Sequence, residues 1–278
     1  MFTAKNYVRA ESLEQAYQLN RKKQNRLVGG MLWLKMSRLA VDTAIDLSAL
    51  GLDTVEETET HFHIGCMTTL RTLETHAALN AYTGGAFREC VKNIVGTAFR
   101  NLATVGGSVY SRFGFSDPLT LLAVLDTSVE LYKGGEIPLA DFLTRPHDRD
   151  ILVRVNLRKQ ENLRCAYLSV RGSRTDFPVL TASASVWHEN GAPFGKIAIG
   201  ARPHIAYPLA FDPQAISTPE GRAAAAKSIA AKTPVYGNMR AGADYRKHLA
   251  RVLAERAFEA LAGVENQAGN QTERSDAR

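Results

Sequence analysis

The chain has 278 residues, of which 45% are hydrophobic and 22% charged, enough material for more than one folded domain. The sequence contains no run of about 18 apolar residues, so we expect no membrane span. Its first residues lack the basic-then-apolar layout of a signal peptide. We therefore expect a cytoplasmic protein. The net charge of +6 does not favour nucleic-acid binding, because the basic residues are not gathered in one stripe with aromatic residues.

Residues 1–54 are expected to form a small βαβ-like subdomain. Ser12 and Gln15 have the spacing of a capping box, and apolar residues follow them at helical spacing. Arg26 to Val28 reads as a strand that leads into a pair of glycines, and Val41 to Leu47 reads as a further strand.

Residues 55–160 are expected to form a second α+β subdomain. His61 to Cys66 alternates like a strand, and Thr68 or Thr69 can cap the helix that follows. Asp117 before Pro118 has the composition of a helix N-cap followed by Pro at N1. The other expected elements are a helix carrying Phe87, Cys90, Val91 and Ile94, and strands over 129–132 and 151–155.

Residues 161–262 are expected to form a separate C-terminal α+β domain. Strand-like runs cover 164–170, 181–188 and 196–201, with a hairpin composition at 189–191. Helical stretches follow over 219–231 and 244–262. A sheet followed by helices is typical of the α+β class, and we expect residues 263–278 to be a disordered tail.

Two Gly-Gly pairs, Gly29-Gly30 and Gly106-Gly107, each come directly after a short apolar run. Paired glycines allow positive φ and close approach of the backbone, so that neighbouring amides can converge on one anion. A tight turn would explain either pair alone. Two pairs separated by a whole subdomain suggest a pyrophosphate held from two sides.

No other motif points to a catalytic or metal site. The sequence has neither G-x-G-x-x-G after a strand nor a Walker-type loop, which excludes the Rossmann and P-loop classes. Its three cysteines are scattered without a C-x-x-C pair, so neither a disulfide framework nor a cysteine-ligated cluster is expected. His61 and His63 share one face of a strand, but no further metal ligand is evident near them.

The residues around both glycine pairs match motifs of one known family. Arg100 to Val109 reads RNLATVGGSV, against a family loop R-N-x-A-T-x-G-G-N-I, and the first pair sits where the family has A-G-G-T-D/N-L-L. Further matches cover Tyr7 to Ala16, Ser116 to Asp126 and Met239 to Arg246. Over residues 1–262 the chain therefore resembles the flavoprotein subunit of the molybdenum hydroxylases, the xanthine dehydrogenase and carbon monoxide dehydrogenase family.

The resemblance implies an α+β fold with a two-subdomain FAD-binding module of the vanillyl-alcohol-oxidase (PCMH) type, followed by the C-terminal α+β domain. It also implies FAD, bound non-covalently because neither loop contains His or Cys. Amides of both loops would hold the pyrophosphate and adjacent sugars, with hydroxyls from Thr104 and Ser108. The implied cofactor-binding residues of the two loops are Leu27, Val28, Gly29, Gly30, Met31, Leu32, Thr104, Gly106, Gly107 and Ser108.

Three further residues match family positions near the flavin. Asp117 would hydrogen-bond the ribityl chain, although a plain helix N-cap would also explain it. Leu152 would lie against the flavin ring, although it would suit any strand core. Asp176 lies in the segment that passes the flavin's exposed edge in the family.

Some residues depart from the family pattern. Met31 and Leu32 replace the usual Thr and Asp or Asn, which removes two side-chain hydrogen bonds worth roughly 0.5–1.5 kcal/mol each. The family's lysine near the isoalloxazine aligns with Leu168. A subunit that has kept the fold and lost the flavin is therefore one alternative.

The function implied by the resemblance is electron transfer. The flavoprotein would take electrons from an iron-sulfur subunit, itself reduced by a molybdopterin subunit, and pass them to NAD⁺ or another acceptor. Cysteine clusters and a molybdopterin domain are absent from this sequence, so both would be on partner subunits. A self-contained flavin oxidoreductase is the other alternative.

Overall fold

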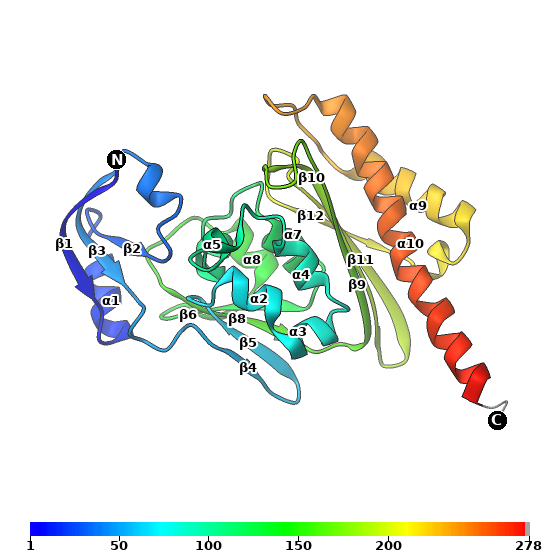
Figure 1. The fold of residues 1–278 in the computed structure, drawn as a ribbon, viewed down its shortest axis with the longest axis horizontal. Coiled ribbons are helices and arrows are strands. Elements are labelled where there is room, and N and C mark those ends of the chain that lie inside the picture. Colours follow the sequence, from blue (N-terminus) through cyan, green and yellow to red (C-terminus); the bar gives the residue numbers. More distant parts are fainter. Residues whose placement is uncertain (276–278) are drawn as a thin grey trace. The chain divides into compact units, whose positions relative to one another are not determined.

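The computed structural model describes the backbone of residues 1–275 and the side chains of residues 1–262 (Figure 1). The chain divides into two compact units, each assembled from separate stretches of sequence. The first contains Met1–His76, Ile94–Arg112 and Asp126–Lys159, and the second contains Ala77–Asn93, Phe113–Leu125 and Gln160–Arg278. This division differs from the three consecutive domains expected from the sequence, because helices within residues 77–93 and 113–125 pack on the C-terminal sheet.

The first unit contains a three-stranded parallel sheet in the order β1-β3-β2, formed by β1 (Thr3–Arg9), β2 (Arg26–Val28) and β3 (Ala40–Asp46). Helix α1 (Leu13–Asn20) connects β1 to β2. The predicted cap is confirmed, since Ser12 Oγ accepts the Gln15 amide at 3.1 Å. The parallel strands are typical of a βαβ unit.

The first unit also contains a five-stranded antiparallel sheet in the order β4-β5-β8-β6-β7. Its inward side chains come from alternate positions, with Phe62 and Ile64 buried on β5 and Val155 and Leu157 on β8. The strands are β4 (Val55–Glu57), β5 (His61–Gly65), β6 (Thr127–Leu131), β7 (Gly135–Pro138) and β8 (Leu152–Arg158), and the accompanying helices are η1 (Leu34–Met36), α2 (Leu70–Thr75), α5 (Thr97–Arg100), α6 (Val105–Tyr110) and α8 (Leu139–Thr144).

The second unit is built on a four-stranded antiparallel sheet in the order β12-β11-β10-β9. The predicted hairpin lies at Asn190 and Gly191, whose φ angles of 51° and 78° suit a two-residue turn with positive φ. The strands are β9 (Glu161–Arg171), β10 (Pro178–Glu189), β11 (Ala192–Gly200) and β12 (Tyr207–Phe211), and the helices are α3 (Ala77–Tyr82), α4 (Ala86–Val91), α7 (Asp117–Leu122), η2 (Pro213–Ile216), α9 (Pro219–Lys232) and α10 (Ala243–Ser275).

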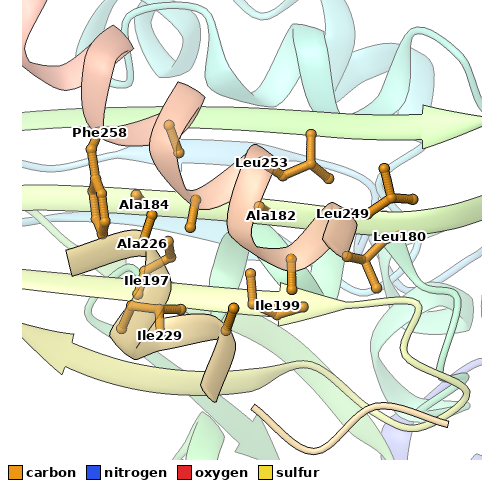
Figure 2. Packing of buried hydrophobic residues seen from close by; sticks show 14 of the residues in the cluster. Leu180, Ala182, Ala184, Ile197, Ile199, Ala226, Ile229, Leu249, Leu253 and Phe258 are labelled. Carbon is orange, nitrogen blue, oxygen red and sulfur yellow. The ribbon is translucent and has the colours of Figure 1, made fainter. Parts of the chain in front are cut away.

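The central strand β10 is covered on both faces. One face carries Leu180, Ala182 and Ala184, which pack beneath Leu253 of α10 and Ile229 of α9 (Figure 2). Small polar residues occupy the other face, where Thr181 Oγ1 lies 3.0 Å from Thr120 Oγ1 of α7. Ser185 Oγ donates to the Val124 carbonyl at 2.5 Å on this same face. The alternation of strand side chains thus separates an apolar layer from a hydrogen-bonded one.

The last helix is longer than the sequence predicts. α10 continues through residues 263–275, which we expected to be disordered, and the rest of that predicted tail lies outside the described residues. The extension contains no proline, and the helix continues through it despite its two glycines, which disfavour helix. Among the helices described, none combines the length and apolar character needed to cross a bilayer.

Candidate functional site

The first glycine loop follows β2 and contains several consecutive backbone amides without an acceptor among the described residues. Within the described part of the chain, the amides of Gly29, Gly30, Met31 and Leu32 donate no hydrogen bond. Gly29 is exposed, and the next three residues are partly exposed. Met31 has a φ of 58°, in the left-handed region. Consecutive unpaired amides in a turn that contains such a residue are the kind of donor set that can bind an anion.

The second glycine loop uses its amides differently. Its glycines lie in helix α6, where Thr104 is the N-cap and accepts the Gly107 amide on Oγ1 at 3.1 Å. The Gly106 amide donates to the Cys66 carbonyl at 2.7 Å, and the Ser108 amide to the Thr104 carbonyl at 3.1 Å. All three amides expected to hold phosphate are therefore engaged within the chain, so in this structure the first loop supplies the unpaired donors.

The glycines of the first loop lie against the segment that opens the second loop. A Cβ added to Gly30 would lie 1.7 Å from the Leu102 carbonyl oxygen, and one added to Gly29 would lie 2.8 Å from Thr104 Oγ1. A Cβ on Gly106 would lie 2.8 Å from the Cys66 carbonyl oxygen. We expected these glycines to let the backbone approach a phosphate. That expectation stays a prediction, and the structure adds a second role, since the missing side chains of Gly30 and Gly106 allow one stretch of backbone to pack directly on another.

A buried ion pair between Arg100 and Glu74 stabilises the segment that opens the second loop. Arg100, which opens the matched motif, donates to Glu74 through Nε at 2.7 Å and through Nη2 at 3.2 Å. Burial alone would raise the pKa of Glu74, but hydrogen bonds from Arg100 and Arg71 hold that pKa below its usual value. Arg100 also donates to the Ile94 carbonyl at 3.2 Å. The pair therefore ties α2 to α5 and fixes the backbone that meets Gly30.

Asp117, a predicted site residue, has two side-chain partners that the sequence did not reveal. Asp117 lies in the second unit at the first position of α7, whereas Ser116 is the N-cap and accepts the Leu119 amide at 3.4 Å. Its buried carboxylate accepts hydrogen bonds from the Tyr167 hydroxyl and, at 2.5 Å, from Arg171 Nη2. Burial raises the pKa of Asp117, and the charge of Arg171 opposes that rise. The N-cap explanation is thus wrong, while the ribityl contact stays a prediction.

Arg171 also links Asp117 to Asp176, another predicted site residue of the second unit. Arg171 Nη1 donates to the Asp176 carbonyl at 2.6 Å, and the Asp176 carboxylate lies 3.6 Å from Arg240 Nη2. The sequence contained a signal for this contact, because Arg171 precedes Asp176 in a short polar loop, but nothing in it placed Asp117 nearby. We therefore add Arg171 and Tyr167 to the residues that shape this region.

Leu152 and Leu168, the two positions that the resemblance places near the flavin ring, pack with other hydrophobic residues. Leu152 begins β8 and is buried within the first unit, in agreement with its alternative role as a strand core residue. Leu168 lies on β9 and packs against the core formed with α9 and α10. Leu27 is partly exposed on β2, and Val28 is buried. Flavin contacts at Leu27, Val28 and Leu152 stay predictions.

The paired histidines have protein partners. The rings of His61 and His63 are stacked with centroids 5.5 Å apart. His63 Nδ1 lies 2.8 Å from Asn156 Oδ1, and His61 Nδ1 lies 2.9 Å from Thr60 Oγ1. Across the residues that the structure describes, no group of three His, Cys, Asp or Glu side chains could hold a metal ion.

Comparison with solved structures finds a similar fold in chains of three oxidoreductase structures. The chain is 21% identical to a chain of Cu,Mo-CO dehydrogenase, with a TM-score of 0.81 and coverage of 94% of this chain and 98% of that one. For quinoline 2-oxidoreductase from Pseudomonas putida 86, the identity is 17%, the TM-score 0.77 and the coverage 94% and 96%. For a carbon monoxide dehydrogenase from Hydrogenophaga pseudoflava, these values are 19%, 0.77, and 92% and 96%.

A comparison with family models matches a single region that contains both glycine loops and the antiparallel sheet of the first unit. A search of curated protein sequences found no match. Residues 2–158, however, match the model described as the FAD binding domain in molybdopterin dehydrogenase. This match covers more than half of the chain and includes both loops that meet at Gly30. The chain therefore belongs to the family of FAD-binding domains of molybdopterin dehydrogenases.

Proposed function

We propose that this chain is the FAD-binding electron-transfer subunit of a molybdenum hydroxylase. The observation that carries the proposal is the run of four unpaired amides at Gly29, Gly30, Met31 and Leu32, packed against a second loop by a backbone contact that only glycine permits. Such a set of donors fits a pyrophosphate, the group at the centre of FAD. When bound, the isoalloxazine would supply the redox chemistry.

The protein's own residues would bind and orient this cofactor. The first loop would donate its amides to the pyrophosphate, and Arg100 with Glu74 would keep the opposing loop in place. Neither loop contains a histidine or cysteine, which supports a non-covalent complex. Any contact from the amide of Gly106, Gly107 or Ser108 would have to share a hydrogen that already has an acceptor.

As an electron-transfer subunit, the chain would work together with partner subunits. An iron-sulfur subunit would deliver electrons to the flavin, a molybdopterin subunit would oxidise the substrate, and NAD⁺ or another acceptor would receive the electrons. One feature of the sequence supports this division: its three cysteines are scattered and do not form a cluster-binding motif. The structures of similar fold include chains of Cu,Mo-CO dehydrogenase and quinoline 2-oxidoreductase, which favours an oxidoreductase complex for this chain.

The direct test is the visible absorption spectrum of the purified chain before and after incubation with FAD, together with calorimetric titration. We expect saturable binding of one FAD that is removed by denaturation. Bound flavin should be reduced by NADH or dithionite and by no small organic substrate. Co-purification from the native host should recover iron-sulfur and molybdopterin subunits.

Each contrary result selects an alternative. A colourless protein whose thermal unfolding midpoint is unchanged by FAD would indicate a structural subunit that has lost the cofactor. Rapid flavin reduction by an organic substrate in the absence of partners would indicate a self-contained oxidoreductase.

A further inference from the structure

Trp33 follows directly after the four unpaired amides of the first loop. The residue is 40% exposed, although tryptophan is usually well buried in a folded protein. Its ring meets Phe99 of α5 nearly edge-on, with centroids 6.1 Å apart and an interplanar angle of 69°. An aromatic surface is therefore held in place next to the four unpaired amides, within the same unit.

The position of this ring relative to the amides suggests which part of a dinucleotide it would meet. In FAD, the adenine is one ribose away from the pyrophosphate, whereas the isoalloxazine is separated from it by a five-carbon ribityl chain. Trp33 is adjacent in sequence to Leu32, the last of the unpaired amides. Such a short spacing favours the nearer ring system.

We propose that Trp33 stacks on the adenine of the FAD held by the first loop, an inference that rests on the proposed function. Stacking also offsets a deficit in this loop. Met31 and Leu32 provide no side-chain donor where the resembling family has a polar pair, and Trp33 stands where that family has Leu. An aromatic partner for a base is worth roughly 5- to 150-fold in affinity, enough to offset the loss of two neutral hydrogen bonds.

The sequence allows a spectroscopic test, because it contains two tryptophans. Trp187 lies in the second unit, stacked on Phe194 at 5.8 Å. In a Trp187→Phe background, the emission therefore comes from Trp33 alone. We expect ADP to change this emission saturably, FMN to change it less at equal occupancy, and inorganic pyrophosphate to bind without a comparable change.

Variants at Trp33 then separate stacking from general packing. Trp33→Ala should weaken FAD and ADP binding by roughly 5- to 150-fold and leave pyrophosphate affinity unchanged, since the amides remain. Trp33→Phe should recover part of the loss. Met36→Ala is the matched control, because Met36 belongs to the same segment, is apolar and is 70% exposed. It should bind all three ligands like the unmodified protein.

The outcomes separate the inference from the proposed function. If the unmodified chain binds FAD and Trp33→Ala binds FAD and ADP equally well, the stacking role is wrong and the FAD function stands. A response of Trp33 emission to FMN and not to ADP would overturn the assignment to adenine. If neither the unmodified chain nor any of its variants binds FAD, both the inference and the proposed function are refuted.

Discussion

The contact between the two glycine loops makes a sharp prediction for Gly30→Ala. A Cβ at this position would lie 1.7 Å from the Leu102 carbonyl oxygen and 2.5 Å from its carbonyl carbon. A carbon and a carbonyl oxygen ordinarily meet at roughly 3.3 Å. One loop would therefore have to move by about 1.6 Å, and both neighbours of the new methyl group are backbone atoms that cannot rotate away.

We expect Gly30→Ala to lower the free energy of unfolding of the first unit by about 1–3 kcal/mol, as overpacking usually does. Because the displaced segment carries the unpaired amides, FAD affinity should fall by at least about tenfold, which corresponds to roughly 1.4 kcal/mol. Urea unfolding followed by Trp33 emission in the Trp187→Phe background reports the first quantity. Calorimetric titration with FAD reports the second.

Gly107→Ala is the matched control. A Cβ there would lie 3.2 Å from Thr104 Oγ1 and within 4 Å of no other atom outside its immediate surroundings. The position is helical, so alanine recovers about 0.5–1 kcal/mol of backbone entropy that offsets the tight contact. Unchanged unfolding and FAD affinity in Gly30→Ala would refute the loop contact. A loss of FAD affinity in Gly107→Ala without destabilisation would show that phosphate approaches the second loop after all.

Three further predictions concern the first loop and the buried charges. Met31→Asn should stabilise the first unit and tighten FAD in a titration, because asparagine tolerates the φ of 58° and adds a donor, whereas threonine is strained there; weaker binding by the asparagine variant would contradict this. The pKa of Glu74 is lowered from 4.5, so its carboxylate stabilises the fold above about pH 4.5 and this contribution is lost as the pH falls through the folded pKa. Glu74→Gln should remove that part of the acid dependence in urea unfolding between pH 3 and 6, and an unchanged profile would mean that the pair with Arg100 contributes nothing. Asp117→Asn should destabilise the second unit by about 3–5 kcal/mol, because it leaves the buried guanidinium of Arg171 without its charged partner; hydrogen exchange of β9 amides as fast as in the unmodified protein would exclude this estimate.

Elements with local sequence signals could be predicted from the sequence alone. Ser12 and Gln15 predicted the start of α1, because a cap and its partner lie within one helical turn. Asn190 and Gly191 predicted the hairpin, because few other residues adopt positive φ at low cost. The motif around Gly106 and Gly107 predicted the family, which the match over residues 2–158 confirmed.

Short elements that are stabilised mainly by tertiary packing were harder to predict from local sequence signals. Strand β1 was not predicted, and its ladder with β3 pairs residues almost forty positions apart. The helical conformation of Gly106 and Gly107 was missed because glycine disfavours helices. In the folded unit, the Thr104 cap and the bond from the Gly106 amide to Cys66 outweigh that preference.

Which donors and acceptors of the predicted site are free to bind a ligand depends on long-range contacts that the sequence does not reveal. The sequence treated the amides of the two loops as equivalent, but hydrogen bonds to Cys66 and Thr104 occupy those of the second loop. It also treated Asp117 as a helix cap or a ligand contact, whereas Arg171, 54 positions away, binds its carboxylate. A composition or a motif records which donors and acceptors exist, but their availability depends on the atoms that folding brings within hydrogen-bond distance.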